Sequence, residues 1–353
     1  RLLWAAYRLS PRLAEFFGKR YMTQMRRHRL DGALPVHRLD RARLRAGDPQ
    51  RLRASLATIA ERRGVEPWFD RFTHSSVRAN DGTKLALEMI TEAGRGRPTV
   101  VFMPGTNAYS LLYGEFLLAL ADAGLNVVGF DPRGHGRSEG QGGSYTLPEL
   151  VDDFAVVVEH ARARMGGPIF AAGSSQGGIA AFYLAASEVE IAGAVCHNAA
   201  DLSDPSSARL TRFPRLGRLF KPALLGLAKI LPEVRVPMRA YLDLKKEPVR
   251  GMGTAHEVLH QDPLLVPYVR LKTLASLGSA PLARPVEAIE TPLLLLQAGA
   301  DTIFPTDYMT TLFERLTCPK QMHVYPGLPH YLVVDHVETL AADVVRWIGE
   351  TCA

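Results

Sequence analysis

Short apolar runs and longer amphipathic stretches alternate over much of the chain. Six runs of four to six residues are too short for helices and are typical of strands, most of them buried. They cover residues 99–103, 126–130, 169–172, 191–196, 293–297 and 321–325. Helical stretches are expected over residues 111–123, 147–164, 177–186, 306–316 and 336–348. This alternation predicts an α/β fold with a mostly parallel central sheet, right-handed crossovers and helices on both faces.

Two further segments do not follow this alternation. Residues 72–79 and 84–90 have the pattern of short strands, and the Asp-Gly turn between them favours a hairpin. Residues 201–287 are rich in proline, leucine and arginine and show no alternating strand pattern. An insertion between two strands of a sheet is most naturally a helical lid over the strand ends. We therefore expect a core in two parts, residues 71–200 and 288–353, with a lid or cap over residues 201–287.

The first 70 residues are predicted to form a basic, helical N-terminal extension. Residues 48–63 are expected to be one helix of it, ended by Gly64. Residues 1–71 carry 17 Arg and Lys against 7 Asp and Glu, whereas the whole chain has a net charge of +6. No base-reading motif is present, so we expect no nucleic-acid partner. The segment could be a solvated helical surface, lie peripherally on a membrane or self-associate, for example in a homodimer.

The composition is that of a soluble globular protein, with 47% hydrophobic and 22% charged residues and no apolar stretch long enough to span a bilayer. Cys196, Cys318 and Cys352 are too sparse for a disulfide framework or a metal site. They favour free thiols in a reducing compartment, so we expect a cytoplasmic protein. The sequence begins at Arg1 and not at Met, which leaves a removed leader open.

The clearest chemical motif is Gly173-Ser174-Ser175-Gln176-Gly177, which fits G-x-S-x-G with Ser175 at its centre. A short strand precedes it and an alanine-rich helix follows. A nucleophile on such a sharp strand-to-helix turn has strained backbone angles, and the flanking glycines avoid clashes there. The motif therefore predicts Ser175 as a nucleophile.

A serine hydroxyl needs a general base, and the base needs a carboxylate that fixes its tautomer. His330 follows the last predicted strand and can reach the edge of the sheet where Ser175 lies; His197 and His336 are alternatives. Asp301 follows the strand at 293–297, and Asp201 is its rival. We favour Ser175, Asp301 and His330, in the chain order that this kind of site uses.

Acyl transfer also needs donors for the developing oxyanion. The backbone N–H groups of Gln176 and Thr106 are the candidates, the second from the loop after the strand at 99–103. Asn107 and Ser174 are expected to contact substrate. The glycine-rich run at residues 131–138 contains a conspicuous histidine, but a tight structural loop is the better interpretation.

With these pieces in place, the chain resembles the α/β-hydrolase superfamily from about residue 71 to its end, apart from the lid. The matching motifs are PGTN, DPRGHGRSEG, GSSQG, AGAD and GLPH, in the family's order. They look most like the lysophospholipase, monoacylglycerol lipase and proline-aminopeptidase-like branch. Many members have His-Gly where this chain has Pro104-Gly105. The resemblance implies Ser175, Asp301 and His330 as a triad, with Thr106 and Gln176 as the oxyanion hole.

The expected activity is that of a carboxylic-ester hydrolase acting on a small-molecule ester through an acyl-enzyme, with no metal or organic cofactor. An apolar acyl or aromatic group is expected because the lid is rich in leucine and phenylalanine, although these side chains could equally pack the lid's own helices. They are Leu202, Leu210, Phe213, Leu216, Leu219, Phe220, Leu224, Leu225 and Leu227. An amidase, a peptidase or a C–C hydrolase could use the same triad, and a non-catalytic binding protein of this fold is a further alternative.

Overall fold

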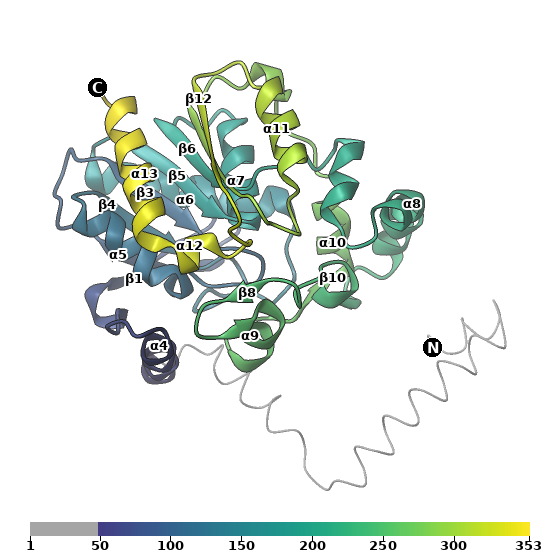
Figure 1. Ribbon diagram of the computed structural model, residues 1–353, viewed down its shortest axis with the longest axis horizontal. Coiled ribbons are helices and arrows are strands. Elements are labelled where there is room, and N and C mark those ends of the chain that lie inside the picture. Colours follow the sequence, from purple (N-terminus) through teal and green to yellow (C-terminus); the bar gives the residue numbers. More distant parts are fainter. Residues whose placement is uncertain (1–48) are drawn as a thin grey trace, which may run out of the picture. The chain divides into compact units, whose positions relative to one another are not determined.

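The computed structural model describes residues 49–353, so the part of the helical extension expected over residues 1–48 lies outside the described residues. An eight-stranded sheet runs in the order β1-β2-β4-β3-β5-β6-β11-β12 (Figure 1). β2 is antiparallel to both neighbours, and all other pairs are parallel. The strands are β1 (Thr73–Arg78), β2 (Lys84–Ile90), β3 (Thr99–Met103), β4 (Asn126–Phe130), β5 (Ile169–Ser174), β6 (Gly193–His197), β11 (Leu293–Ala298) and β12 (Lys320–Tyr325).

Helices flank this sheet. Every residue of β3, β4, β5, β6 and β11 is buried, as expected for parallel strands that are covered on both faces. α5 contacts α13, and α6 contacts α7, whose residues are all buried. The flanking helices are α5 (Gly114–Asp122), α6 (Leu147–Met165), α7 (Gln176–Ala185), α11 (Thr306–Arg315), α12 (Leu332–Asp335) and α13 (Val337–Thr351). The predicted α/β fold is thus confirmed, and it is the α/β-hydrolase fold.

The element boundaries agree closely with the sequence pattern. The hairpin is β1 paired with β2, and the six further predicted strands are all present. The helix expected over residues 111–123 begins as the 3-10 turn η2 (Ser110–Tyr113) and continues as α5. Gly114 starts α5 under the indole of Trp68, where a Cβ would lie 2.1 Å from the ring. Close packing therefore requires glycine at this junction.

The described part of the N-terminal extension packs on the core. α4 (Pro49–Arg63) buries Leu52, Leu56 and Ile59, and η1 (Phe69–Arg71) follows it. Arg63 reaches Glu115 at the start of α5, with 2.5 Å between Nε and Oε1. The expected helix therefore exists from residue 49 onward, and its apolar face is covered by the core.

The insertion between β6 and β11 contains helices, as expected, and also very short strands that the sequence pattern did not reveal. Strands of two or three residues are too short to show a period of two. The elements are η3 (Pro205–Leu210), α8 (Pro214–Ile230), β7 (Arg235–Pro237), η4 (Met238–Ala240), β8 (Pro248–Val249), β9 (Gly253–Thr254), α9 (Ala255–Gln261), β10 (Tyr268–Arg270), α10 (Leu271–Leu277) and η5 (Val286–Ala288). β7 pairs with β10 and β8 with β9, both antiparallel. We call residues 201–287 the cap.

Within residues 49–353, no helix is both long enough and apolar enough to cross a membrane.

Candidate active site

Ser175 lies on the sharp turn between β5 and α7. Its φ of 54° and ψ of −116° are strained for a residue with a side chain. The flanking glycines explain why the turn can form: a Cβ on Gly173 would lie 2.2 Å from the backbone of Gly177, and a Cβ on Gly177 would lie 2.0 Å from the carbonyl oxygen of Met103. The turn is tied to the next strand by the Ser175 N–H, which donates to the His197 carbonyl at 2.8 Å.

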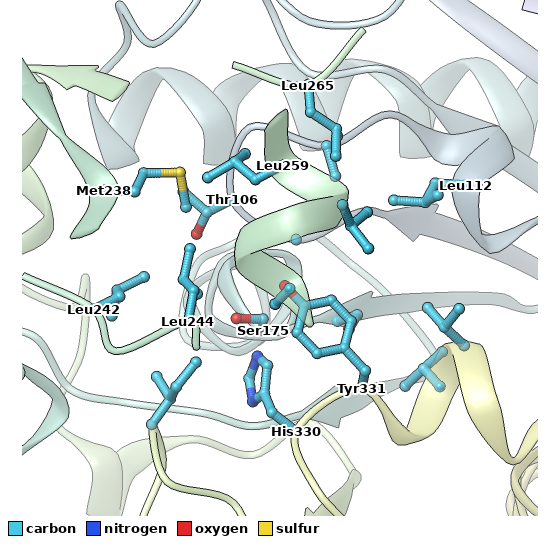
Figure 2. A pocket seen from close by; sticks show the side chains of 18 of the residues that line it. Thr106, Leu112, Ser175, Met238, Leu242, Leu244, Leu259, Leu265, His330 and Tyr331 are labelled. Atoms are coloured by element: carbon cyan, nitrogen blue, oxygen red, sulfur yellow. The ribbon is translucent and has the colours of Figure 1, made fainter. Parts of the chain in front are cut away.

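His330 and Asp301 lie at the same edge of the sheet as Ser175. Asp301 follows β11 and His330 follows β12, and the carboxyl ends of parallel strands meet at one edge. His330 Nδ1 and Asp301 Oδ2 are 2.8 Å apart. Because a carboxylate only accepts, Nδ1 donates and Nε2 is left to accept a proton. Figure 2 shows the His330 ring facing the Ser175 side chain, and both residues line one cavity.

The charges of the pair favour an ionised carboxylate beside a basic imidazole. Burial opposes ionisation of Asp301, but His330 and the backbone N–H of Phe304 outweigh it and hold the pKa of Asp301 below its usual value. Burial alone would lower the pKa of His330. The Asp301 carboxylate, with a smaller contribution from Glu247, raises the pKa of His330 above its usual value instead. The imidazolium that forms when a base takes a proton is therefore stabilised.

The rival residues are placed elsewhere. His197 Nδ1 is 2.9 Å from Ser174 Oγ, and burial, followed by the nearby His330, lowers the pKa of His197 to about 3, so this ring stays neutral. Asp201 Oδ1 accepts from the Ser203 N–H at 3.0 Å and stabilises its own turn. His336 precedes α13, at its N-terminal boundary. Of the two candidates Asp201 and Asp301, Asp301 is thus the carboxylate at hydrogen-bond distance from the His330 ring.

Gly105 and Thr106 follow β3 and lie beside the sharp turn at Ser175, which we call the elbow. A Cβ on Gly105 would be 3.6 Å from the Ser175 Cβ, and Thr106 lines the cavities that Ser175 lines. Gln176 is the first residue of α7, so its N–H has no carbonyl one turn earlier in the helix. Both predicted oxyanion donors therefore adjoin the Ser175 side chain. Tyr113, which sequence reasoning did not single out, accepts from the Gly105 N–H at 3.2 Å and braces this loop.

The two residues expected to contact substrate have protein partners. The Asn107 amide donates to the carbonyls of Val266 and Tyr268 at 2.8 and 2.7 Å, which ties the core loop to the cap. Asn107 does not line either of the two cavities at Ser175. Ser174 lines the smaller cavity, and its hydroxyl contacts His197. A role of these two side chains in substrate binding stays a prediction.

Two cavities meet at Ser175. The smaller, of about 60 Å³, is mostly apolar, and Figure 2 shows Leu242, Leu244 and Leu259 of the cap around it. The larger, of about 740 Å³, extends under the cap and is lined by apolar side chains of α8 and α10, among them Phe220 and Leu274. Neither lining contains an Asp or Glu residue. The larger cavity can therefore take an apolar group of more than a few carbon atoms next to Ser175.

The glycine-rich loop at residues 131–138 makes structural contacts. Arg133 donates to both carboxylate oxygens of Asp153, at 2.7 and 2.6 Å, and Asp131 accepts from the Ser110 N–H at 2.8 Å. His135 accepts from the Gly143 N–H at 3.1 Å. These contacts fit the structural interpretation of the loop.

Three side chains at this site, His197, Asp301 and His330, are of types that bind metal ions, and their ligand atoms lie within 4.8 Å of one another. The 2.8 Å between His330 Nδ1 and Asp301 Oδ2 is that of a direct hydrogen bond. Two ligands of one tetrahedral zinc ion would lie roughly 3.4 Å apart. The donor set therefore fits an imidazole–carboxylate pair better than a metal centre.

Glu247 of the cap is a residue that sequence reasoning missed. It is fully buried and accepts from the His330 backbone N–H at 2.9 Å. It lies in a run of charged residues, Lys245-Lys246-Glu247, which gives no local signal of burial. Only the fold brings it to His330, which is 83 residues away in the sequence.

Comparison with known proteins places this site in a family. A family model described as "Serine aminopeptidase, S33" matches residues 94–336, a span that includes Ser175, Asp301 and His330. The chain belongs to this family. It is 26% identical to a monoacylglycerol lipase of Mycolicibacterium smegmatis, over 76% of this chain and 93% of that protein. It is 25% identical to a non-heme haloperoxidase of Rhodococcus erythropolis, over 77% of this chain and 98% of that protein.

A solved structure of similar fold is the monoacylglycerol lipase of Paleococcus ferrophilus, with a TM-score of 0.59 and 24% identity over 76% of this chain and 99% of that one. The resemblance to the monoacylglycerol-lipase branch is therefore confirmed. Esterases, lipases and haloperoxidases are all found among the relatives of this serine hydrolase.

Proposed function

We propose that the protein hydrolyses carboxylic esters with an apolar acyl or aromatic group, through an acyl-enzyme on Ser175. The observation that carries this proposal is the 2.8 Å contact between His330 Nδ1 and Asp301 Oδ2, beside a serine on a strained elbow. Acyl transfer needs a base that can activate the serine and a serine side chain presented to the substrate, which the sharp turn provides, whereas a binding protein needs neither.

In the first half of the reaction, Ser175 Oγ attacks the ester carbonyl carbon as His330 Nε2 takes the hydroxyl proton. The backbone N–H groups of Thr106 and Gln176 hold the negative charge on the former carbonyl oxygen. The tetrahedral species collapses, the bond to the alcohol oxygen breaks, and His330 returns the proton to that leaving oxygen. In the second half, His330 deprotonates a water that attacks the acyl-enzyme, and the acid leaves as Ser175 regains its proton.

The cap supports an apolar substrate. The larger cavity is lined mainly by leucine, phenylalanine and other apolar side chains, and its volume of about 740 Å³ suits a medium or long acyl chain. An aminopeptidase substrate presents a cationic amine, and no carboxylate lines either cavity to receive it. Glycerol esters of fatty acids are a sensible first group of test substrates, because two of the relatives are named as monoacylglycerol lipases.

The test is a panel of p-nitrophenyl esters from acetate to palmitate, together with a fluorophosphonate probe. We expect hydrolysis and covalent labelling, both of which disappear in Ser175→Ala. A Ser187→Ala variant is the control, because the Ser187 hydroxyl donates to the Leu184 carbonyl at 2.6 Å and this residue lines neither cavity. Folded protein that hydrolyses none of the esters, or that is still labelled without the Ser175 hydroxyl, would contradict the proposal.

A further inference from the structure

Glu247 joins the cap to both loops of the imidazole–carboxylate pair. Its Oε2 accepts from the backbone N–H of His330 at 2.9 Å. Its Oε1 accepts from the backbone N–H of Thr302 at 3.0 Å and from the Thr302 hydroxyl. Thr302 directly follows Asp301. One carboxylate therefore bridges the loop that carries the base and the loop that carries its acidic partner.

The cap holds Glu247 firmly in this place. The Glu247 carbonyl accepts from the N–H of Ala255, the first residue of α9, at 2.9 Å. Three residues further on from Glu247, the backbone N–H of Arg250 donates to both oxygens of Asp335, each at 3.1 Å. The β8–β9 hairpin between these contacts is thus fastened to the cap on one side and to the core on the other.

A buried carboxylate at this position is costly unless it is well satisfied. Its partners are N–H and O–H groups, and within residues 49–353 no Lys or Arg side chain forms an ion pair with Glu247. A glutamine would span the same distance without burying a charge, but its amide offers only one acceptor oxygen where the two loops need two. The nearby negative charge does favour a protonated His330, the form that the reaction produces transiently.

We propose that Glu247 is a positioning residue of the reaction: it sets the separation and orientation of Asp301 and His330 from the cap, so that the pair is aligned only while the cap is seated. This inference rests on the proposed serine hydrolase function. Because one side chain contacts both loops, any displacement of Glu247 would withdraw an acceptor from both loops at once.

The charge of Glu247 provides a readout that a merely structural role would not change. The ionisable groups around the His330 ring are Asp301 after β11, His197 of β6, Tyr331 next in the chain and Glu247 of the cap. Asp301 and Glu247 raise the pKa of His330, so loss of the Glu247 charge lowers it. The base is active when it is neutral. The acid limb of kcat/KM should therefore move to lower pH in Glu247→Gln.

The experiment compares Glu247→Gln with Asp262→Asn on the ester that the wild type hydrolyses best. In Glu247→Gln one of the two loops loses its acceptor, so we expect kcat to fall by about tenfold or more with little change in KM. Asp262 is the matched control: it is a buried cap carboxylate that accepts from the Tyr109 hydroxyl at 2.8 Å, away from His330. The Asp262→Asn variant should leave the acid limb in place.

The variant Glu247→Asp separates the effect of the negative charge from the effect of side-chain length. It keeps the negative charge but is one methylene too short to contact both loops, so kcat should fall while the acid limb stays near its wild-type pH. It also serves if Glu247→Gln does not fold, as judged by circular dichroism.

This inference would be overturned if Glu247→Gln had the wild-type kcat and an unmoved acid limb, or if Asp262→Asn shifted the acid limb equally. In either case, hydrolysis that depends on Ser175 would leave the proposed function intact. Absence of Ser175-dependent hydrolysis in the wild type would overturn both.

Discussion

The substitution Asp301→Asn tests the site most directly, because the structure dictates how the new amide must be oriented. Asp301 Oδ1 accepts from the backbone N–H groups of Ile303 and Phe304, each at 2.8 Å. Backbone N–H groups can only donate, so an oxygen is required at that position, whereas Oδ2 faces the His330 ring and the Asn198 amide, which can each present an acceptor instead. The nitrogen of the introduced amide would therefore replace Oδ2 and face His330 Nδ1.

This orientation reverses the hydrogen bond to the base. An amide NH₂ donates, so His330 Nδ1 must accept, and the ring proton moves to Nε2. Nε2 then presents an N–H to Ser175 where the reaction needs a lone pair. The same change in the well-studied serine protease triad lowers kcat on the order of 10⁴-fold, and we expect a loss of this size here.

The assay is kcat and kcat/KM for a p-nitrophenyl ester, with thermal unfolding measured in parallel. Asp201→Asn is the matched control, because the Asp201 carboxylate accepts from Ser203 in its own turn and not from His330. We expect it to keep activity close to that of the wild type. An Asp301→Asn enzyme within about tenfold of the wild type, or an equal loss in Asp201→Asn, would refute the reasoning from geometry.

Gly177→Ala should abolish activity and lower the melting temperature, since its Cβ would lie 2.0 Å from the Met103 carbonyl oxygen; an active, stable variant would contradict the packing described for the elbow. In the wild type, the acid limb of kcat/KM should have its midpoint above the usual histidine pKa of about 6.5, because Asp301 outweighs burial and raises the pKa of His330. A pH–rate profile with a midpoint below that value would count against His330 as the base. Leu274→Trp should reduce kcat/KM for long-chain esters more than for acetate, because Leu274 lines the larger cavity; equal effects along the ester panel would show that the acyl chain binds elsewhere.

The sheet and the elbow could be predicted from the sequence because both depend on local rules. Runs such as 99–103 and 126–130 are apolar nearly throughout, which is the signature of strands buried on both faces, and they are the strands β3 and β4. The glycines of G-x-S-x-G mark a turn whose close backbone contacts exclude side chains. The order of strands along the chain was enough to place Ser175, Asp301 and His330 at one edge, since parallel strands end there together.

The contacts between segments that are distant in the sequence could not be predicted in the same way. Asp201 and Asp301 both follow strands, and only the coordinates show that Asp301 is the residue 2.8 Å from His330. Glu247 could not be found from the sequence, because its burial results from the cap folding over residues 302 and 330 and not from its neighbours in the chain. Strand and turn propensities act over a few residues, whereas the partner of a buried charge is set by packing between segments that the sequence does not bring together.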